Sequence, residues 1–497
     1  MEKFKITKNN RPVGLKEVPE LPFTEFRHAA ISACSAGKRV IGLFGVNAGG
    51  SKVRMYSALA DDDASSILLA STLLDKGLLY RSFTNDAPMF HIFEREFYEA
   101  FGIRPEGHPW LKPVRYPWDA PDKSNKMENY PFFLSEGGSM HEVAVGPVHA
   151  GIIEPGHFRF QCAGEKVQHL EIQLGYQHRG VEALMETGPA VKTAHLAESV
   201  CGDTVVGHAS AYASLIEALS GSDAPRRAGV IRAIALELER AAMHTAGLSA
   251  IAGDIAYLMG NAVFGANRTK LINTSLLLCG SRFGRGLVRP GGVLFDINAE
   301  TAEIIKKNVN LAFDRISEMA EEMFASPSVL SRLQQTGVVR KEDAVKLGLT
   351  GFAARASGIA VDAREDHPSG AYVNFPVRKQ VIESGDCFAR AYLRYMEIGQ
   401  SVKLINEMCD NLPSGKIMSD ETALSGDSIC VSVVEGWRGG IVYIGITDYK
   451  GAIRKIKIKD PSFNNWYGLA VAVRNNGISD FPLCNKSFDL SYCGNDL

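Results

Sequence analysis

The chain lacks the features that mark membrane-spanning, secreted or nucleic-acid-binding proteins. None of its 497 residues lies in a run close to the ~20 consecutive apolar residues of a membrane helix. The starting segment MEKFKITKNNRPVG has no apolar core of the kind found in secretion signals. With 54 basic and 56 acidic residues the net charge is −2, so no overall field attracts nucleic acid. We expect a soluble, cytoplasmic chain with no nucleic-acid partner.

Clustered cysteines are absent as well. The nine cysteines lie far apart and include no CxxC pair. This spacing argues against a disulfide framework, a zinc ribbon or an iron–sulfur cluster held by this chain alone. The hydrophobic fraction of 45% is nevertheless ample for large cores.

The pattern of apolar residues predicts an α+β protein. Residues 1–122 alternate helical and strand patterns and predict a small α/β module, and a linker at 123–145 rich in Pro, Gly, Asn and charge follows it. Within the module we expect helices at 23–37, 64–75 and 88–109 and strands at 38–48 and 51–63.

Residues 146–497 predict a mainly helical bundle domain with a small antiparallel sheet near the carboxyl terminus. We expect long helices at 191–221, 226–253, 301–326 and 387–415, and strands at 429–436, 440–448 and 452–460. The helix predicted at 191–221 is rich in small residues, which implies close approach by another helix. One stripe of it carries Ala194, Ala197, Cys201, Thr204 and His208 at spacings of three and four.

Three polar clusters stand out. The first spans Gly146 to Glu182 and contains His149, Glu154, His157, Arg159, His178 and Arg179 around tight turns. The second is Cys201, Thr204 and His208, although a lone Cys is commonly just a small buried hydrophobe. The third joins Arg355-Ala-Ser-Gly358 to Asp362-Ala-Arg364. Solvated or hydrogen-bonded turns are the plain alternative for the first and third, but Arg355 follows apolar residues and is expected to point inward.

Together these motifs resemble a fusion of two complex I peripheral-arm subunits, the 30-kDa and 49-kDa types. Large subunits of group 4 membrane-bound [NiFe] hydrogenases, including the formate hydrogenlyase type, share this fusion. The 30-kDa resemblance rests on Phe93-Glu-Arg-Glu-Phe-Tyr-Glu-Ala-Phe-Gly-Ile103 and Gly107-His-Pro109. The 49-kDa and hydrogenase resemblance rests on Gly146-Pro-Val-His149, Glu154-Pro-Gly-His-Phe-Arg159, His178-Arg-Gly-Val-Glu182, Glu198-Ser-Val-Cys-Gly202, Arg355-Ala-Ser-Gly358, Asp362-Ala-Arg364, Gly385-Asp-Cys387, Leu412-Pro-Ser-Gly415 and Ser479-Asp-Phe-Pro482.

The chain departs from this family at the nickel ligands. A [NiFe] centre takes thiolates from two CxxC motifs, whereas here the first motif is Cys201-Gly-Asp-Thr204. In the second, Asp489-Leu-Ser491-Tyr-Cys493-Gly494, Ser491 and Gly494 stand where the family has cysteines, and Cys493 is offset. The removable carboxyl-terminal extension of hydrogenase precursors is also missing after Cys493. We therefore expect no metal and no cofactor in this chain.

The resemblance implies partners and a location. We expect a 20-kDa-type iron–sulfur small subunit that carries a [4Fe–4S] cluster, membrane subunits, and a peripheral position on the cytoplasmic side of the inner (plasma) membrane. Quinone is a candidate ligand, with His149, Thr204, His208 and Asp362 as cofactor-binding residues. His149 matches the first His of the 49-kDa GPxHP motif, but Ile153 occupies the position of the second.

Five residues are the catalytic candidates that the resemblance implies: Glu182, Arg355, Asp489, Cys201 and Cys493. Burial is expected to raise the pKa of Glu182 for proton handling, a salt bridge being the alternative. Arg355 would be the positive group of the cavity, held by Asp362 and Asp489 or linked with them in a proton path. Cys201 and Cys493 are expected to lie close together, either as a reactive pair or vestigial metal site, or as two unreacted thiols.

Four functions follow from these features. The first is a subunit that couples electron transfer from the partner cluster to proton chemistry without a [NiFe] centre. The second is a non-catalytic scaffold that transmits conformational change to ion-pumping membrane subunits. The third is a quinone-reducing subunit, and the fourth, disfavoured by the missing ligands, is an ordinary [NiFe] hydrogenase.

Overall fold

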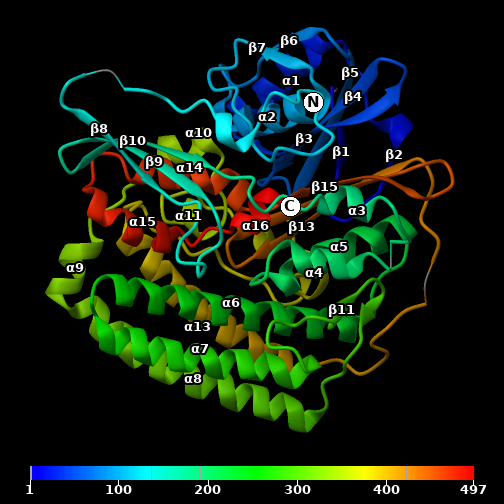
Figure 1. Ribbon diagram of the computed structural model, residues 1–497. Helices are drawn as coiled ribbons and strands as arrows, with labels where there is room; N and C mark the ends of the chain where they lie inside the picture. Colours follow the sequence, from blue (N-terminus) through cyan, green and yellow to red (C-terminus); the bar gives the residue numbers. More distant parts are fainter. Residues whose placement is uncertain (1–2, 136, 191, 421) are drawn as a thin grey trace.

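Two four-stranded antiparallel sheets pack face to face in the upper half of the molecule (Figure 1). The computed structural model describes residues 3–135, 137–190, 192–420 and 422–497. The first sheet has the order β1 (Lys5–Thr7), β5 (Ser66–Asp75), β4 (Lys52–Asp61) and β3 (Arg39–Gly49). The second has the order β15 (Ile453–Lys459), β14 (Gly439–Thr447), β13 (Ser428–Gly436) and β2 (Val13–Gly14). The α+β class and the small antiparallel sheet near the carboxyl terminus are confirmed.

The helix predicted at 64–75 is wrong, because this segment forms strand β5. Its alternate residues serve two different cores: Leu68 and Ala70 pack with the helices of the amino-terminal module, whereas Ile67 and Leu69 face the second sheet. A strand buried on both faces has a continuous apolar run, which periodicity alone does not distinguish from a buried helix. The helices α1 (Phe23–Ser35) and α2 (His91–Phe101) lie as predicted.

The two halves of the chain are interleaved at this sheet pair. Val13 of β2 pairs with Ile429 of β13, so a strand from the first 122 residues completes the carboxyl-terminal sheet. The end of the predicted linker is also ordered into a strand: β8 (Met140–Val145) forms a three-stranded antiparallel sheet with β9 (His157–Ala163) and β10 (Lys166–Gln173). Residue 136 of the linker lies outside the described residues.

Four long helices form the lower layer of Figure 1: α6 (Arg226–Asp254), α7 (Leu258–Cys279), α8 (Ala299–Ala325) and α13 (Cys387–Asp410). The sequence predicts three of them and misses α7, which replaces the helix predicted at 191–221 as the fourth member. None of the helices in the described part of the chain combines the length and the hydropathy needed to cross a membrane.

The segment predicted as one helix at 191–221 is broken in the middle. It forms α4 (Ala194–Val200) and α5 (Val205–Ser220), with Cys201 to Thr204 between them, and residue 191 lies outside the described residues. The carboxylate of Glu239 on α6 accepts the N–H groups of Val206 (2.7 Å) and Gly207 (3.1 Å), which satisfies the start of α5 as a separate helix. Instead of joining the bundle, α5 packs on β13 and β14.

Short elements connect these layers. They are η1 (Leu15–Glu17), β6 (Leu79–Arg81), η2 (Pro88–Phe90), β7 (Arg104–Glu106), η3 (Met127–Asn129), α3 (Val181–Met185), β11 (Val288–Arg289), β12 (Gly292–Val293), α9 (Pro327–Leu333), α10 (Lys341–Leu347), α11 (Gly351–Arg355), α12 (Ala363–Asp366), η4 (Gly370–Val373), α14 (Ser462–Ala472), η5 (Ile478–Asp480), α15 (Phe481–Phe488) and α16 (Tyr492–Asp496). Figure 1 places the carboxyl terminus in the middle of the molecule, beside α16.

Candidate functional site

Two thiols meet where the break between α4 and α5 faces α16. The Sγ of Cys201 lies 3.1 Å from the hydroxyl oxygen of Ser491, and the Sγ of Cys493 lies 3.5 Å from the same oxygen. Both cysteines are buried and unoxidised. The expectation that these distant residues lie close together therefore agrees with the structure. We call Cys201, Asp203, Thr204, Arg438, Ser491 and Cys493 the thiol centre.

A buried guanidinium group occupies the side of the thiol centre opposite α16. Arg438 lies in the turn between β13 and β14, and its Nη1 is 3.5 Å from the Sγ of Cys201 and 3.2 Å from the Oγ1 of Thr204. It donates to both carboxylate oxygens of Asp203, at 2.6 and 2.8 Å, and stacks 3.9 Å above the ring of Trp437. This cation is fixed on three sides and stands beside the sulfur.

Glycine allows that turn to approach its neighbour. The φ of Gly351, at the start of α11, is +66°, and a Cβ there would lie 2.0 Å from the carbonyl oxygen of Arg438. Any other residue would push the turn away from α11, and Arg438 would move with it.

The two thiols differ in acidity. The hydrogen bond to Cys493, together with burial and the charge of Asp203, raises the pKa of Cys201 well above its ordinary value. The same hydrogen bond lowers the pKa of Cys493 against the effect of burial. Cys493 is therefore the thiolate side of the pair and Cys201 the side that keeps its proton. Although burial opposes it, Arg438 lowers the pKa of Asp203 to about 2.

The thiol centre does not fit a [NiFe] group. A Cβ added at Gly494 would lie 2.7 Å from the Cγ of Asp460 and 2.9 Å from the hydroxyl oxygen of Ser491, so this position has no room for a thiolate ligand. The N–H of Gly494 donates to Ser491 at 2.8 Å, which turns that hydroxyl into a helix cap. Arg438 adds a positive charge where a metal would need anionic donors.

Asp489 lies at the edge of the thiol centre. It ends α15 with a φ of +55°, and its carboxylate lies 3.7 Å from Arg394 and 3.9 Å from Arg438. Burial raises the pKa of Asp489, and the two arginines oppose that rise. Among the predicted residues, Asp489 therefore joins Cys201, Thr204 and Cys493 in one place.

Arg355 does not lie at the thiols, contrary to the sequence-based expectation. It is 1% exposed and donates to Glu435 at 3.0 Å and to Glu397, and it lies 3.6 Å from Asp362. Asp362 caps α12 and holds Arg364 at 2.7 Å. Both residues therefore belong to a buried ion network, where each charge is matched by an opposite one.

This ion network reaches the thiol centre through three residues. Glu397 accepts from His244 at 3.0 Å, His244 lies 3.3 Å from Arg394, and Arg394 lies 3.7 Å from Asp489. We define the ion network by its members: Glu237, Arg240, His244, Arg355, Asp362, Arg364, Arg394, Glu397 and Glu435.

The expected rise in the pKa of Glu182 is wrong. Its Oε1 accepts from Lys457 Nζ at 3.0 Å and from the N–H of Ile458 at 2.8 Å. Burial alone would raise the pKa, but Lys457, Lys455 and Arg115 outweigh it and lower the pKa of Glu182 to about 2. The salt-bridge alternative therefore describes Glu182, with lysine rather than arginine as the partner.

The two histidines predicted to bind a cofactor hydrogen-bond to the protein. His208 is fully buried, with Nδ1 3.1 Å from the Tyr443 hydroxyl and Nε2 3.1 Å from Asp460. His149 lies on the loop beside the thiol centre, and its Nε2 is 2.9 Å from the carbonyl oxygen of Gly156.

Sequence reasoning missed Asp203 and Arg438, the two charged members of the thiol centre. Asp203 stands inside the Cys201-to-Thr204 motif, and Arg438 follows Trp437 in what the sequence presents as an ordinary hairpin turn. The signal was an arginine enclosed by two strands without a solvent-facing side, since every residue of β13 and β14 is buried.

Comparison with known families agrees with this two-part architecture. Residues 32–130 match the family described as "Respiratory-chain NADH dehydrogenase, 30 Kd subunit". Residues 254–429 match the family described as "Respiratory-chain NADH dehydrogenase, 49 Kd subunit".

Individual relatives come from both hydrogenases and NADH-quinone oxidoreductases. Hydrogenase-4 component G of Escherichia coli (strain K12) is 29% identical over 421 residues, which cover 81% of this chain and 73% of that protein. An NADH-quinone oxidoreductase protein of Clostridium beijerinckii is 29% identical over 348 residues, which cover 69% of this chain and 94% of that protein.

A chain of the solved membrane-bound sulfane sulfur reductase, an archaeal respiratory membrane complex, has the same fold. It superposes with a TM-score of 0.68 at 23% identity and covers 72% of this chain and 99% of that one.

The fold and these matches define a class in which 30-kDa-type and 49-kDa-type domains of respiratory-chain NADH dehydrogenase are fused in one chain. The chain belongs to this class and is homologous to large subunits of membrane-bound hydrogenases and to the 49-kDa-type subunits of NADH-quinone oxidoreductases.

Proposed function

We propose that this chain is the hydrogenase-like large subunit of a membrane-associated respiratory or energy-converting complex. It receives electrons from a [4Fe–4S] cluster in a 20-kDa-type partner and couples their transfer to proton chemistry at the thiol centre, without a [NiFe] centre. The observation that carries this proposal is the pairing of Cys201 and Cys493 on one hydroxyl, beside the buried guanidinium group of Arg438.

The residues of the thiol centre divide the work by their acidity. Two electrons from the partner cluster and two protons reduce a two-electron acceptor to its dihydro form. Cys201, which keeps its proton, and Asp489, whose pKa burial raises, supply protons, and Arg438 stabilises the anion formed before the second proton arrives. No step of this scheme needs a nickel ligand.

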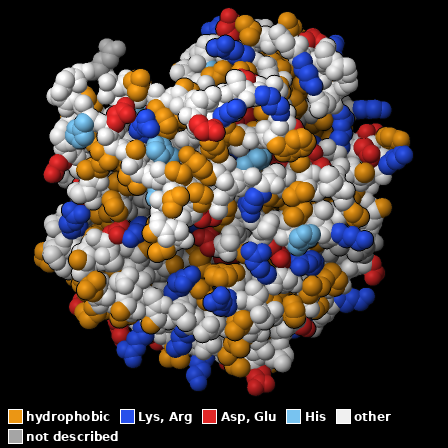
Figure 2. All heavy atoms as spheres, viewed as in Figure 1, with side chains coloured by type: hydrophobic (Ala, Val, Ile, Leu, Met, Phe, Trp, Pro, Cys, Tyr) orange, Lys and Arg blue, Asp and Glu red, His pale blue; other side chains and the backbone are white. Residues whose placement is uncertain are grey.

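An exposed apolar loop beside the thiol centre supports the docking of a partner there. Val148 and Ile152 are 78% and 85% exposed. The same loop continues to Glu154, whose carboxylate accepts the N–H of Tyr492 at 3.3 Å, next to Cys493. Figure 2 shows hydrophobic side chains gathered in patches over the middle of one face, with charges of both signs around them. Such patches are typical of protein–protein contacts. We place this contact on the cytoplasmic side of the membrane.

Quinone reduction is the second candidate, favoured by the NADH-quinone oxidoreductase relatives. His149 lies on the same loop, but its Nε2 already contacts the carbonyl oxygen of Gly156, so a quinone oxygen would have to compete with that bond. In this version the acceptor that oxidises the cluster is a short-chain quinone.

The test is the reoxidation of the partner cluster in the purified intact complex. The cluster is reduced, and its absorbance or EPR signal is followed after addition of a sulfane-sulfur compound, a short-chain quinone, or buffer. We expect acceptor-dependent reoxidation together with nickel far below one atom per complex. A cluster that stays reduced with every acceptor would favour a non-catalytic scaffold, and stoichiometric nickel with hydrogen-dependent dye reduction would identify an ordinary hydrogenase.

A further inference from the structure

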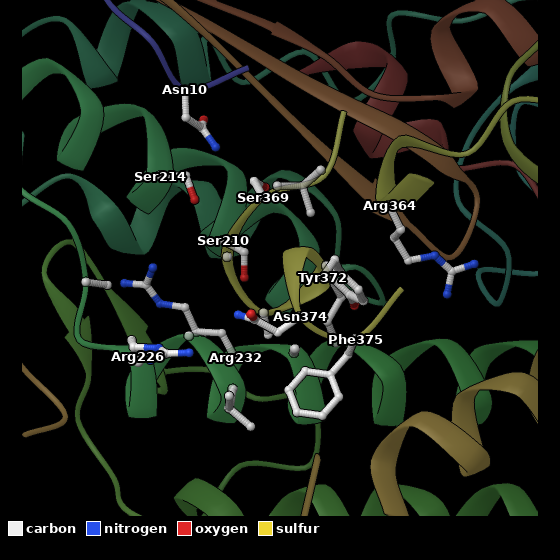
Figure 3. A pocket seen from close by; sticks show the side chains of 18 of the residues that line it. Asn10, Ser210, Ser214, Arg226, Arg232, Arg364, Ser369, Tyr372, Asn374 and Phe375 are labelled. Atoms are coloured by element: carbon white, nitrogen blue, oxygen red, sulfur yellow. The ribbon is translucent and has the colours of Figure 1, made fainter. Parts of the chain in front are cut away.

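A cavity of about 740 Å³ lies between α5, the amino end of α6, η4 and β13. Figure 3 looks into it. No member of the thiol centre lines this cavity. Its volume falls within the ~300–1,000 Å³ of typical small-molecule sites.

The charges in the depth of the cavity already have partners. Arg232 donates to both carboxylate oxygens of Glu217, at 2.6 and 3.1 Å. Arg364 is held by Asp362 and Glu237 of the ion network. These pairs shape a rigid, neutral wall and leave recognition to other groups.

Two polar atoms on the wall lack partners within the described residues. The hydroxyl oxygen of Ser210 is buried and makes no hydrogen bond, and Ser210 as a whole is 7% exposed. The side-chain oxygen of Asn10, on the amino-terminal segment, is buried and unpaired as well. Figure 3 shows Ser210, Ser214 and Asn374 around the same space. Buried polar groups in native proteins are normally hydrogen-bonded, so a ligand with matching groups completes this wall.

One end of the cavity is suited to an anion. Arg226 is the first residue of α6, a helix of 29 residues, and makes no ion pair within the described residues. The first N–H groups of a long helix are free and carry a partial positive charge. Figure 3 shows Arg226 and Arg232 on the same side of the cavity. Asp223 and Glu407 also line the cavity, so the anion is held by Arg226 and the helix start rather than by a general positive field.

The other side offers a flat apolar surface. Tyr372 and Phe375 both line the cavity, and the Tyr372 hydroxyl donates to Glu237 at 2.6 Å, which fixes its ring. Leu236 and Val434 complete the apolar part of the wall. Aromatic rings held in this way suit the face of a planar ligand.

We propose that this cavity binds an organic anion of nucleotide size that carries a flat ring. Its phosphate or carboxylate lies at Arg226 and the start of α6, its ring lies against Tyr372 and Phe375, and its hydroxyl or amide groups pair with Ser210 and Asn10. This site is separate from the thiol centre and does not depend on the function proposed for it.

The test uses ADP as the probe, with adenosine and inorganic phosphate as its two halves, titrated calorimetrically into the purified protein in its complex. We expect saturable ADP binding, with adenosine weaker by about tenfold or more and phosphate weaker still. Arg226→Ala and Phe375→Ala should each weaken ADP binding by about tenfold or more. Arg315→Ala, which removes an exposed arginine from α8, should leave it unchanged.

A Ser210→Leu variant fills the cavity and should abolish binding, its folding being checked by circular dichroism; the Phe375 variant gives the same information if Ser210→Leu does not fold. Absence of saturable ADP binding would overturn the proposal. So would equal affinity for ADP and adenosine, or unchanged affinity in a folded Arg226→Ala variant.

Discussion

Cys201 and Cys493 show how single residues set the chemistry of the thiol centre. The thiols share the Ser491 hydroxyl, and the hydrogen bond between them raises the pKa of Cys201 and lowers that of Cys493. Arg438 adds a charge that a thiolate ligand set for a metal would not need. The residues at the former ligand positions are thus tied into the protein itself.

Restoring a cysteine at residue 494 should not restore a nickel site. In Gly494→Cys the new Cβ would meet Asp460, which His208 and Ser462 hold in place. We expect a loss of about 1–3 kcal/mol in the free energy of unfolding, as in other overpacked sites. Chemical denaturation and nickel analysis of the variant check this, with Gly138→Cys on the exposed linker as the control. A stable variant that binds nickel would contradict it.

Glu182 should stabilise the folded state rather than transfer protons. Its pKa is about 2, below the ordinary value of 4.5, so its contribution is complete above pH 4.5 and is lost as the pH falls toward 2. Glu182→Gln should therefore unfold about 1–2 kcal/mol more easily at pH 7, and the difference should shrink below pH 4. Denaturation curves at both pH values measure it. A variant that keeps its stability at pH 7 but loses turnover would return Glu182 to a proton-handling role.

At the scale of the element, the sequence predicts helices and strands well where one face is buried. The helices α1, α6, α8 and α13 and the hairpins of both sheets lie close to the expected residues. Strand β5 failed because both of its faces are buried in different cores. The break at Cys201 failed because the stabilising partner, Glu239, is distant in the sequence.

The separate start of α5 should respond to pH. Burial raises the pKa of Glu239 to about 8, although the N–H groups of Val206 and Gly207 oppose the rise. The folded state therefore holds this proton more tightly than the unfolded chain, and stability falls as the pH rises from about 4.5 to 8. Glu239→Gln keeps the neutral form, so its stability relative to the unmodified protein should rise by about 1–3 kcal/mol between pH 5 and pH 9.

Thermal unfolding of both proteins across this range measures the effect of Glu239→Gln. Glu300→Gln, on the exposed start of α8, is the matched control and should show no such trend. A constant difference between Glu239→Gln and the unmodified protein would contradict the account of this carboxyl group.

At the scale of the whole molecule, the sequence predicts which motifs matter better than which of them meet. Cys201, Thr204, Cys493 and Asp489 do converge, because the carboxyl-terminal helices return to the break before α5. Arg355 and Asp362 carry equally strong motif signals but lie in the ion network. Motif spacing does not encode the third dimension, and the partner of each buried charge is known only once the chain has folded.

The interleaved sheets make the two halves one structural unit. Strand β2 completes the carboxyl-terminal sheet, and the ion network runs from the cavity beside α6 to Asp489 at the thiol centre. This continuity is what a scaffold would need to transmit motion, and it is equally what a redox centre needs to hold its charged groups in place.

Acceptor-dependent reoxidation of the partner cluster, compared between Cys201→Ala and Cys430→Ala complexes, tests the central claim most directly. Both cysteines are fully or almost fully buried, but Cys430 lies in β13 and makes no contact with the thiol centre. The account predicts that Cys201→Ala slows reoxidation by about tenfold or more in an assembled complex, whereas Cys430→Ala leaves the rate unchanged. Equal rates in the two complexes would contradict redox chemistry at the thiol centre.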